Sequence, residues 1–187
     1  MLSIGGKEIV VKALIQSIPT YVMSLFQMPQ SLITEIQRLF ARFWWGSNEK
    51  EWKIHWGSWN CLCSPKHSRG LGFRDLIVFN RAIVAKQCWR VLTNLDSLAA
   101  KVLRGYYFLG GDFLQAYSQP SGSFLWKSLV WGRGLIEVGT RWRVGRGTSI
   151  LVYQDRWIPR PSTFQVISPP VLGEMITGSQ LKNPSRG

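Results

Sequence analysis

The sequence predicts a mainly α-helical protein, and three observations support that fold class. Apolar side chains recur at helical spacing in five segments of the 187-residue chain. The strict alternation that is typical of a strand occurs in one short region, around residues 140–157. Hydrophobic residues make up 45% of the chain, which is enough for a packed core at this length. We therefore expect a helical bundle, a helical connector, one small β-hairpin and an irregular C-terminal tail.

The clearest predicted helix covers residues 31–46. Ser31 is a candidate N-cap and Gly46 a candidate C-terminal stop. Glu35, Arg38 and Arg42 fall on the opposite side of this helix from the apolar residues. The apolar stripe consists of Leu32, Ile33, Ile36, Leu39, Phe40, Phe43 and Trp44.

The remaining elements follow from periodicity, caps and breakers. Pro19 ends or kinks the first helix, and Asp75 caps the third. The expected helices cover residues 7–18, 31–46, 75–93, 97–108 and 123–137. The expected divisions are 1–46 (N-terminal helices), 47–139 (Trp-rich loop and helical connector), 140–157 (hairpin region) and 158–187 (Pro-rich).

A β-hairpin is predicted where the period changes from helical to alternating. Gly145-Arg-Gly-Thr lies between the alternating runs Thr140-Arg-Trp-Arg-Val and Ile150-Leu-Val-Tyr. In a strand, Trp142 and Val144 would share one face, with Arg141 and Arg143 on the other. Residues 158–187 hold five of the nine prolines and are expected to be a linker or the truncated start of another domain.

The chain is strongly basic, with 23 Lys+Arg against 10 Asp+Glu and a net charge of +13. Such a charge indicates a polyanionic partner, either nucleic acid or an anionic membrane surface. We expect sequence-independent contact with a phosphate backbone, against the alternative that these cations form ordinary solvated faces. The predicted contact residues are Arg141, Arg143 and Arg146 first, then Lys86, Arg90, Lys101 and Arg104.

Half of the ten tryptophans lie between residues 44 and 59, among Lys50, Lys53 and His55. Aromatic rings among cations can stack on bases, or they can form a small core under a loop. Trp44 lies on an apolar stripe and is expected in the core, whereas both interpretations stay open for Trp52 and Trp56.

The sequence offers no set of residues for catalysis, so no catalytic residue and no cofactor is expected. Asp75, Asp96, Asp112 and Asp155 are scattered singly, whereas two-metal chemistry needs carboxylates close together. His55, Cys61, Cys63 and His67 cluster in sequence, but their spacing is not that of a zinc site, and no metal is expected.

The uncharged stretch Ala13–Thr34 raises the question of a membrane helix. Pro19 and Pro29 interrupt it, so no transmembrane segment is expected. Three cysteines imply no disulfide framework and favour a reducing compartment. The compartment itself stays unknown, with nucleus or cytoplasm favoured and an organelle as the alternative.

An ordered series of short segments resembles the plant LINE-type (non-LTR) retrotransposon polyproteins. It begins with Leu2-Ser-Ile-Gly-Gly-Lys-Glu-Ile-Val-Val-Lys-Ala-Leu-Ile-Gln-Ser-Ile-Pro-Thr-Tyr-Val-Met-Ser. It continues with Ala41-Arg-Phe-Trp-Trp-Gly, Lys53-Ile-His-Trp, Gly70-Leu-Gly-Phe-Arg-Asp-Leu, Asn80-Arg-Ala-Ile-Val-Ala-Lys-Gln and Trp89-Arg. Arg141-Trp-Arg-Val-Gly-Arg-Gly and Gln154-Asp-Arg-Trp-Ile-Pro complete a series that spans roughly residues 2–160.

The resemblance implies a reverse transcriptase thumb (about residues 2–46) and connector, placed between the palm and the zinc-binding and ribonuclease H regions. The family's paired catalytic aspartates lie upstream, and no position here matches them, so the chain is not expected to be an enzyme on its own. The implied partners are template–primer nucleic acid, bound by charge, and the missing palm domain of the parent protein.

Three alternatives remain at the level of sequence. The chain could be a non-functional remnant that folds poorly because its apolar stripes once packed on the palm. It could act in trans as one piece of a split polymerase. It could also be a peripheral membrane or interaction protein that uses Trp and Arg at an interface.

Overall fold

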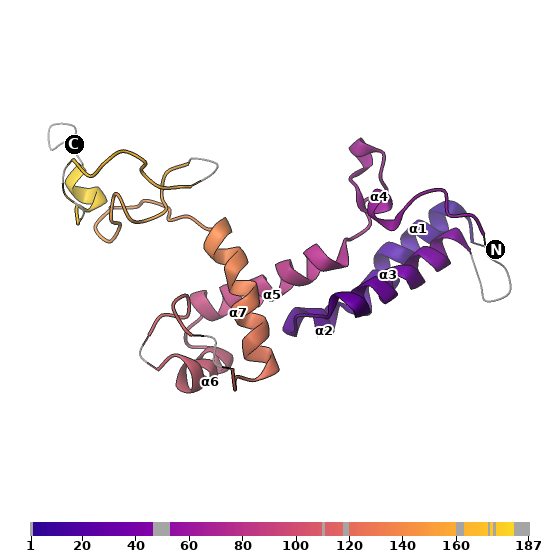
Figure 1. Cartoon of the computed structure of the whole chain (residues 1–187), viewed down its shortest axis with the longest axis horizontal. Coiled ribbons are helices and arrows are strands. Elements are labelled where there is room, and N and C mark those ends of the chain that lie inside the picture. Colours follow the sequence, from indigo (N-terminus) through magenta and orange to yellow (C-terminus); the bar gives the residue numbers. More distant parts are fainter. Residues whose placement is uncertain are drawn as a thin grey trace. The chain divides into compact units, whose positions relative to one another are not determined.

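The structure is a computed structural model that describes residues 2–46, 53–109, 111–117, 120–159, 163–171, 173 and 175–181. The chain divides into two compact units, Met1–Glu137 and Val138–Gly187. We call them the helical unit and the C-terminal unit. The mainly α-helical class is confirmed, because the described residues form seven α-helices and no named strand (Figure 1).

The first half of the helical unit contains α1 (Ile4–Ala13), α2 (Thr20–Leu25), α3 (Gln30–Trp45) and the short α4 (Trp59–Cys63). Ser3 caps α1 by accepting a hydrogen bond from the amide of Gly6, and Gly46 ends α3 in a left-handed conformation with φ of 73°. These helices surround a first core. Its buried members are Val11, Met23, Ile33, Phe40, Trp59, Phe73 and Leu76.

The second half contains α5 (Leu76–Thr93), α6 (Leu98–Tyr107) and most of α7 (Phe124–Gly139), whose last two residues belong to the C-terminal unit. Trp126 is fully buried at the centre of a second core, where its ring stacks on Tyr107 with centroids 4.4 Å apart. The other buried members are Ala85, Cys88, Val91, Ala100, Leu103, Phe108, Phe113, Ala116, Leu129 and Ile136.

Helix α5 joins the two cores of the helical unit. Its first residue, Leu76, is buried in the first core, whereas Cys88 and Val91 near its other end are buried in the second. Helix α7 crosses α5 (Figure 1). The two helices approach closely at Gly132, where a Cβ atom would lie 2.7 Å from Val84 Cγ1. Both cores therefore depend on the position of one helix.

The helix predictions are confirmed at α5, α6 and α7 and need correction in the first half. The expected helix 7–18 begins earlier, at Ile4, and breaks after Ala13. Ser31 lies inside α3 rather than at its N-cap, which is Pro29. Leu32 and Leu39 of the predicted stripe are 40% and 59% exposed. The stripe is therefore wider than the surface that α1, α4 and α5 cover.

The predicted hairpin over residues 140–157 is wrong, because no strand forms there. The backbone of Ile150–Val152 pairs with a segment far along the chain: the Val152 amide donates to Ile176 O, and the Gly178 amide donates to Ile150 O, both at 2.9 Å. A single antiparallel bridge joins Leu151 to Thr177. The distant segment takes the hydrogen bonds that a local hairpin would have used, and the described tail is otherwise irregular apart from a 3-10 turn at Gly178–Leu181.

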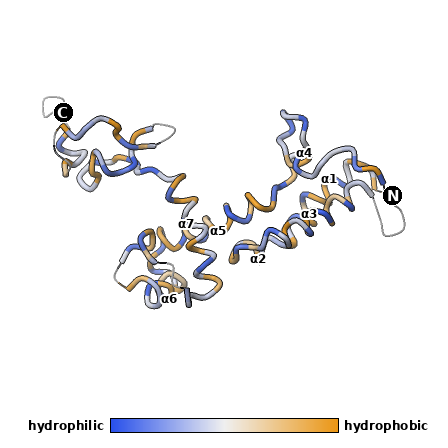
Figure 2. The backbone as a smooth tube through the Cα atoms, in the orientation of Figure 1, coloured by the Kyte–Doolittle hydropathy of each residue, from blue (hydrophilic) through white to orange (hydrophobic). Residues whose placement is uncertain are grey.

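Hydrophobic and hydrophilic residues are interleaved along the helices (Figure 2). Within the described ranges, none of the helices combines the length and the apolar character that crossing a bilayer would require.

Candidate nucleic-acid interface

Four of the seven predicted contact residues lie on α5 and α6. Asp75 caps α5 by accepting hydrogen bonds from the Ile77 and Val78 amides, and Ser97 caps α6 through the Ala100 amide. Lys86 and Arg90 on α5 are exposed, and so are Lys101 and Arg104 on α6. Each pair therefore presents its charge to solvent from a well-capped helix.

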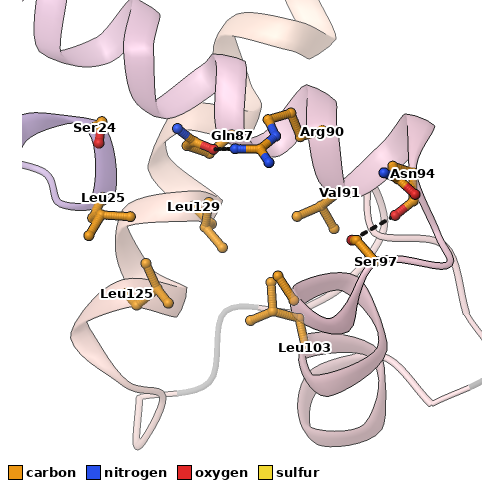
Figure 3. A pocket seen from close by; sticks show the side chains of 11 residues that line it. Ser24, Leu25, Gln87, Arg90, Val91, Asn94, Ser97, Leu103, Leu125 and Leu129 are labelled. Atoms are coloured by element: carbon orange, nitrogen blue, oxygen red, sulfur yellow. Dashed lines mark hydrogen bonds between the residues drawn. The ribbon is translucent and has the colours of Figure 1, made fainter. Parts of the chain in front are cut away.

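Arg90 lies at the rim of a pocket of about 260 Å³ between α2, α5, α6 and α7 (Figure 3). Its Nη1 donates to Gln87 Oε1 at 3.1 Å. The interior of the pocket is apolar, with Leu25, Val91, Leu103, Leu125 and Leu129 among its lining residues. Lys86, Lys101 and Arg104 do not line it, so the structure does not gather these four cations in one hollow.

The C-terminal unit holds the other three predicted residues. Arg141 and Arg143 line an open hollow of about 410 Å³, whereas Arg146 is exposed outside it. The guanidinium of Arg141 lies 6.0 Å from the centre of the Phe164 ring, which is cation–π distance. The remaining lining residues are Trp142, Val144, Trp157 and Pro159.

Backbone hydrogen bonds bring the two walls of this hollow together. The Trp142 amide donates to Arg156 O at 2.6 Å, which places residues 141–144 beside residues 156–159. The indole Nε1 of Trp157 donates to Val152 O at 2.9 Å, and the Trp157 amide donates to Phe164 O at 2.8 Å. Trp157 is thus held from both its backbone and its ring.

The predicted arrangement of residues 141–144, with arginines on one strand face and Trp142 and Val144 on the other, is wrong. Strand alternation would have separated Trp142 and Val144 from Arg141 and Arg143, but all four line the same hollow. Trp142, Trp157 and Phe164 were therefore missed as site residues. The sequence signal for them was their aromatic character and, for Trp142, its place between Arg141 and Arg143.

Most of the predicted contact cations lack an acidic partner. Lys101 Nζ lies 3.9 Å from Asp96 Oδ1, but both side chains are largely exposed, so this pair contributes little. The other six show no carboxylate oxygen within 4.0 Å among the described residues.

Other cations serve the fold instead. Lys12 and Lys66 both pair with Glu8, at 2.8 Å and 3.1 Å. Arg133 pairs with Glu137 and donates through Nη1 to the carbonyls of Phe113 and Ala116. These three cations are thus engaged within the helical unit and differ from the predicted contact set.

The Trp-rich segment divides between core and surface. Trp44 packs edge-on against Phe73 with centroids 5.2 Å apart, so its predicted core position is confirmed. Trp44 is half-buried against the first core and Trp59 is fully part of it, whereas Trp56 is 82% exposed. Trp52 and Lys50 lie outside the described residues.

Two of the three cysteines, Cys63 and Cys88, are poorly suited to thiolate chemistry, whereas Cys61 is exposed. Burial raises the pKa of the Cys63 thiol to about 11, with the nearby Asp75 charge adding to the effect. Burial raises the pKa of Cys88 to about 12, and its Sγ lies 3.1 Å from Leu129 O. Within the described residues, no three His, Cys, Asp or Glu side chains gather as metal ligands would.

Two plant proteins are similar to this chain over most of its length. The uncharacterized mitochondrial protein AtMg00310 of Arabidopsis thaliana is 36% identical over 143 residues, which are 76% of this chain and 93% of that protein. The putative ribonuclease H protein At1g65750 of Arabidopsis thaliana is 35% identical over 160 residues, or 84% of this chain. The chain spans only 26% of the length of that second relative. No protein-family profile matches the chain, and no solved structure matches it.

Proposed function

Since the chain belongs to the family of the Arabidopsis mitochondrial protein AtMg00310, we propose that it is a retroelement-derived segment that binds the phosphate backbone of nucleic acids without sequence preference. In this proposal the segment descends from the thumb and connector of a reverse transcriptase, and none of its positions matches the paired catalytic aspartates of the palm. It performs no polymerase chemistry by itself.

The observation that supports this proposal is a set of exposed cations, most of which have no carboxylate partner. All seven predicted contact residues are exposed, and six of them have no carboxylate partner among the described residues. A lysine or arginine that is already paired must break that pair before it binds phosphate, whereas an unpaired one only releases water and counterions. The cations of this set can therefore contact a phosphate backbone without disturbing the fold.

The relationship to a longer protein supports the origin of the segment. The putative ribonuclease H protein contains a region similar to this chain within about a quarter of its length. The name of that relative concerns an enzyme that acts on nucleic acid. A non-catalytic region of such a polypeptide would hold nucleic acid by charge while other regions carry out chemistry.

Anisotropy titrations of a labelled single strand at two salt concentrations test the binding. If all seven cations contact phosphate, affinity should fall about a thousandfold between about 50 mM and 200 mM salt, because each contact contributes about 0.7 to the salt slope. An affinity that does not change with salt would contradict backbone binding. Primer-extension assays of the chain alone should show no incorporation, and any incorporation would contradict a non-catalytic role.

A matched pair of variants separates local contact from overall charge. The double variant Arg141→Gln/Arg143→Gln and the double variant Lys12→Gln/Lys66→Gln have the same net charge. The first should lower the salt slope by about 1.4, since it removes two contacts. The second removes cations that already pair with Glu8 and should leave the slope unchanged. Equal effects would indicate that net charge alone governs binding.

One observation favours a second candidate, in which the chain needs further polypeptide to be stable. Large apolar side chains are unusually exposed within the first 22 residues, and such exposure marks surfaces that pack on a partner. They are Leu2, Ile4, Ile9, Leu14, Ile18, Tyr21 and Val22. Aggregation on expression and the absence of a protease-resistant core would favour this candidate, and liposome flotation would identify membrane binding instead.

A further inference from the structure

We propose that the hollow of the C-terminal unit binds an unpaired nucleotide, whose base stacks on Trp142 and whose phosphate lies against Arg143. The protein would then prefer single strands with accessible bases to duplexes. This inference rests on the proposed function and deepens it, because it names the form of nucleic acid that this one site recognises.

The first observation is the exposure of the Trp142 side chain on a backbone that is anchored by a hydrogen bond. Its side chain is 61% exposed although its backbone amide is bound to Arg156 O at 2.6 Å. Leaving a large ring in water forgoes the stabilisation that burial would provide. An exposed indole on an anchored stretch of backbone, lining a hollow, is an arrangement on which a base can stack.

The second observation is the charge of the hollow. Two of its six lining residues are arginines and none is acidic. Asp155, the nearby carboxylate in sequence, accepts a hydrogen bond from the Leu151 amide at 2.7 Å. Arg141 lies over Phe164, whereas Arg143 is exposed and has no acidic partner among the described residues. Arg143 is therefore the better placed of the two for a mobile phosphate.

The third observation is the volume of the hollow and the anchoring of one of its walls. Its volume of about 410 Å³ falls within the range of pockets that hold small organic ligands. Trp157 forms part of its wall and is held rigid by the bond from its Nε1 to Val152 O. A base within a duplex already stacks on its neighbours, so the face that Trp142 requires is accessible only in an unpaired strand.

Strands of equal charge but different base content test the inference. The probes are a labelled oligothymidylate of about 16 nucleotides, an abasic strand of equal length and the corresponding duplex. The wild-type chain should bind the oligothymidylate about tenfold more tightly than the abasic strand. An oligouridylate should show the same preference if the site accepts RNA as well as DNA. Equal affinities for the base-bearing and abasic strands would overturn the inference.

Variants assign the preference to a single ring. Trp142→Ala should bind the base-bearing and abasic strands equally, so that the tenfold preference is lost, whereas Trp142→Phe should keep most of the preference. The matched control is Trp56→Ala, which removes another highly exposed indole from the helical unit and should keep the preference. A preference that survives in Trp142→Ala, or is lost in Trp56→Ala, would overturn the assignment.

The wild-type chain gives a readout that does not depend on the folding of a variant. Irradiation with an iodouracil-substituted strand should crosslink the peptide that contains Trp142, as identified by mass spectrometry. Crosslinks confined to other peptides would overturn the inference while leaving backbone binding intact. Absence of any binding at low salt, to base-bearing and abasic strands alike, would instead overturn the proposed function and this inference together.

Discussion

The side-chain oxygen of Asn80 on α5 accepts a hydrogen bond from the Met28 amide at 2.9 Å, in the segment between α2 and α3. The amide nitrogen of the same side chain donates to the carbonyls of Met23 and Phe26, at 2.7 Å and 2.8 Å. Asn80 is 1% exposed. It therefore satisfies three backbone groups where Pro29 prevents the helix from continuing.

Asn80→Ala should be strongly destabilising. It removes one buried side chain and leaves three backbone groups without their partner, so we expect a loss of about 3 kcal/mol in the free energy of unfolding. Urea unfolding followed by circular dichroism measures it. The control Asn60→Ala, at an exposed position of α4, should change stability by less than about 0.5 kcal/mol. Similar values for the two variants would contradict this role for Asn80.

Two glycine-to-alanine substitutions should change the free energy of unfolding in opposite directions. At Gly132 a Cβ atom would lie 2.7 Å from Val84 Cγ1 and 3.1 Å from the Ala85 amide, so Gly132→Ala should cost about 1–3 kcal/mol. At Gly105 in α6 nothing lies within 4 Å, so Gly105→Ala should stabilise by about 0.5–1 kcal/mol.

Thermal unfolding of both variants measures whether Gly132→Ala lowers the Tm and Gly105→Ala raises it. Val84 is fully buried, so Val84→Ala is itself destabilising, but the double variant Gly132→Ala/Val84→Ala should lose less stability than the sum of the two single variants, because it removes the methyl group that the new Cβ atom meets. A neutral effect of Gly132→Ala would show that α5 and α7 do not cross as closely as the structure indicates.

Stability should depend on pH through Glu8. Its hydrogen bonds with Lys12 and Lys66 lower the pKa of the carboxyl group in the folded state. The unfolded chain then binds more protons between the two pKa values, so this contribution is present at neutral pH and is lost as pH falls through the folded pKa.

Glu8→Gln should therefore have a lower Tm than wild type at neutral pH, and the two Tm values should converge in acid. Thermal melts across that range measure the difference. Added salt should reduce it at neutral pH, because the group is solvent-accessible. A Tm difference that persists unchanged in acid would be inconsistent with an ionic origin.

Thiol reactivity should follow the order Cys61, Cys63, Cys88. Cys61 is exposed, whereas burial raises the pKa of Cys63 to about 11 and of Cys88 to about 12, so little thiolate forms at mildly alkaline pH. Titration with a chromogenic disulfide should show one fast thiol, which Cys61→Ser abolishes, and all three in denaturant. Rapid reaction of Cys88 in the folded chain would contradict the packing of the second core.

The helices were predictable where local signals agreed. Asp75 before an apolar run predicted the start of α5, and Gly46 predicted the end of α3. The break after Ala13 and the short helix α4 were not predicted. Both depend on packing against the first core more than on local periodicity.

The candidate interface was predictable in composition but not in arrangement. The net charge of +13 and the exposed cations of α5 and α6 follow from residue type and helical period. The sequence by itself determined the helical class, the main caps and the excess of basic residues, because these depend on neighbours within a few positions. Only the tertiary structure decided that Trp142 shares a hollow with Arg141 and Arg143, because the backbone of Ile150–Val152 pairs with residues around Thr177 and no local strand forms to separate them.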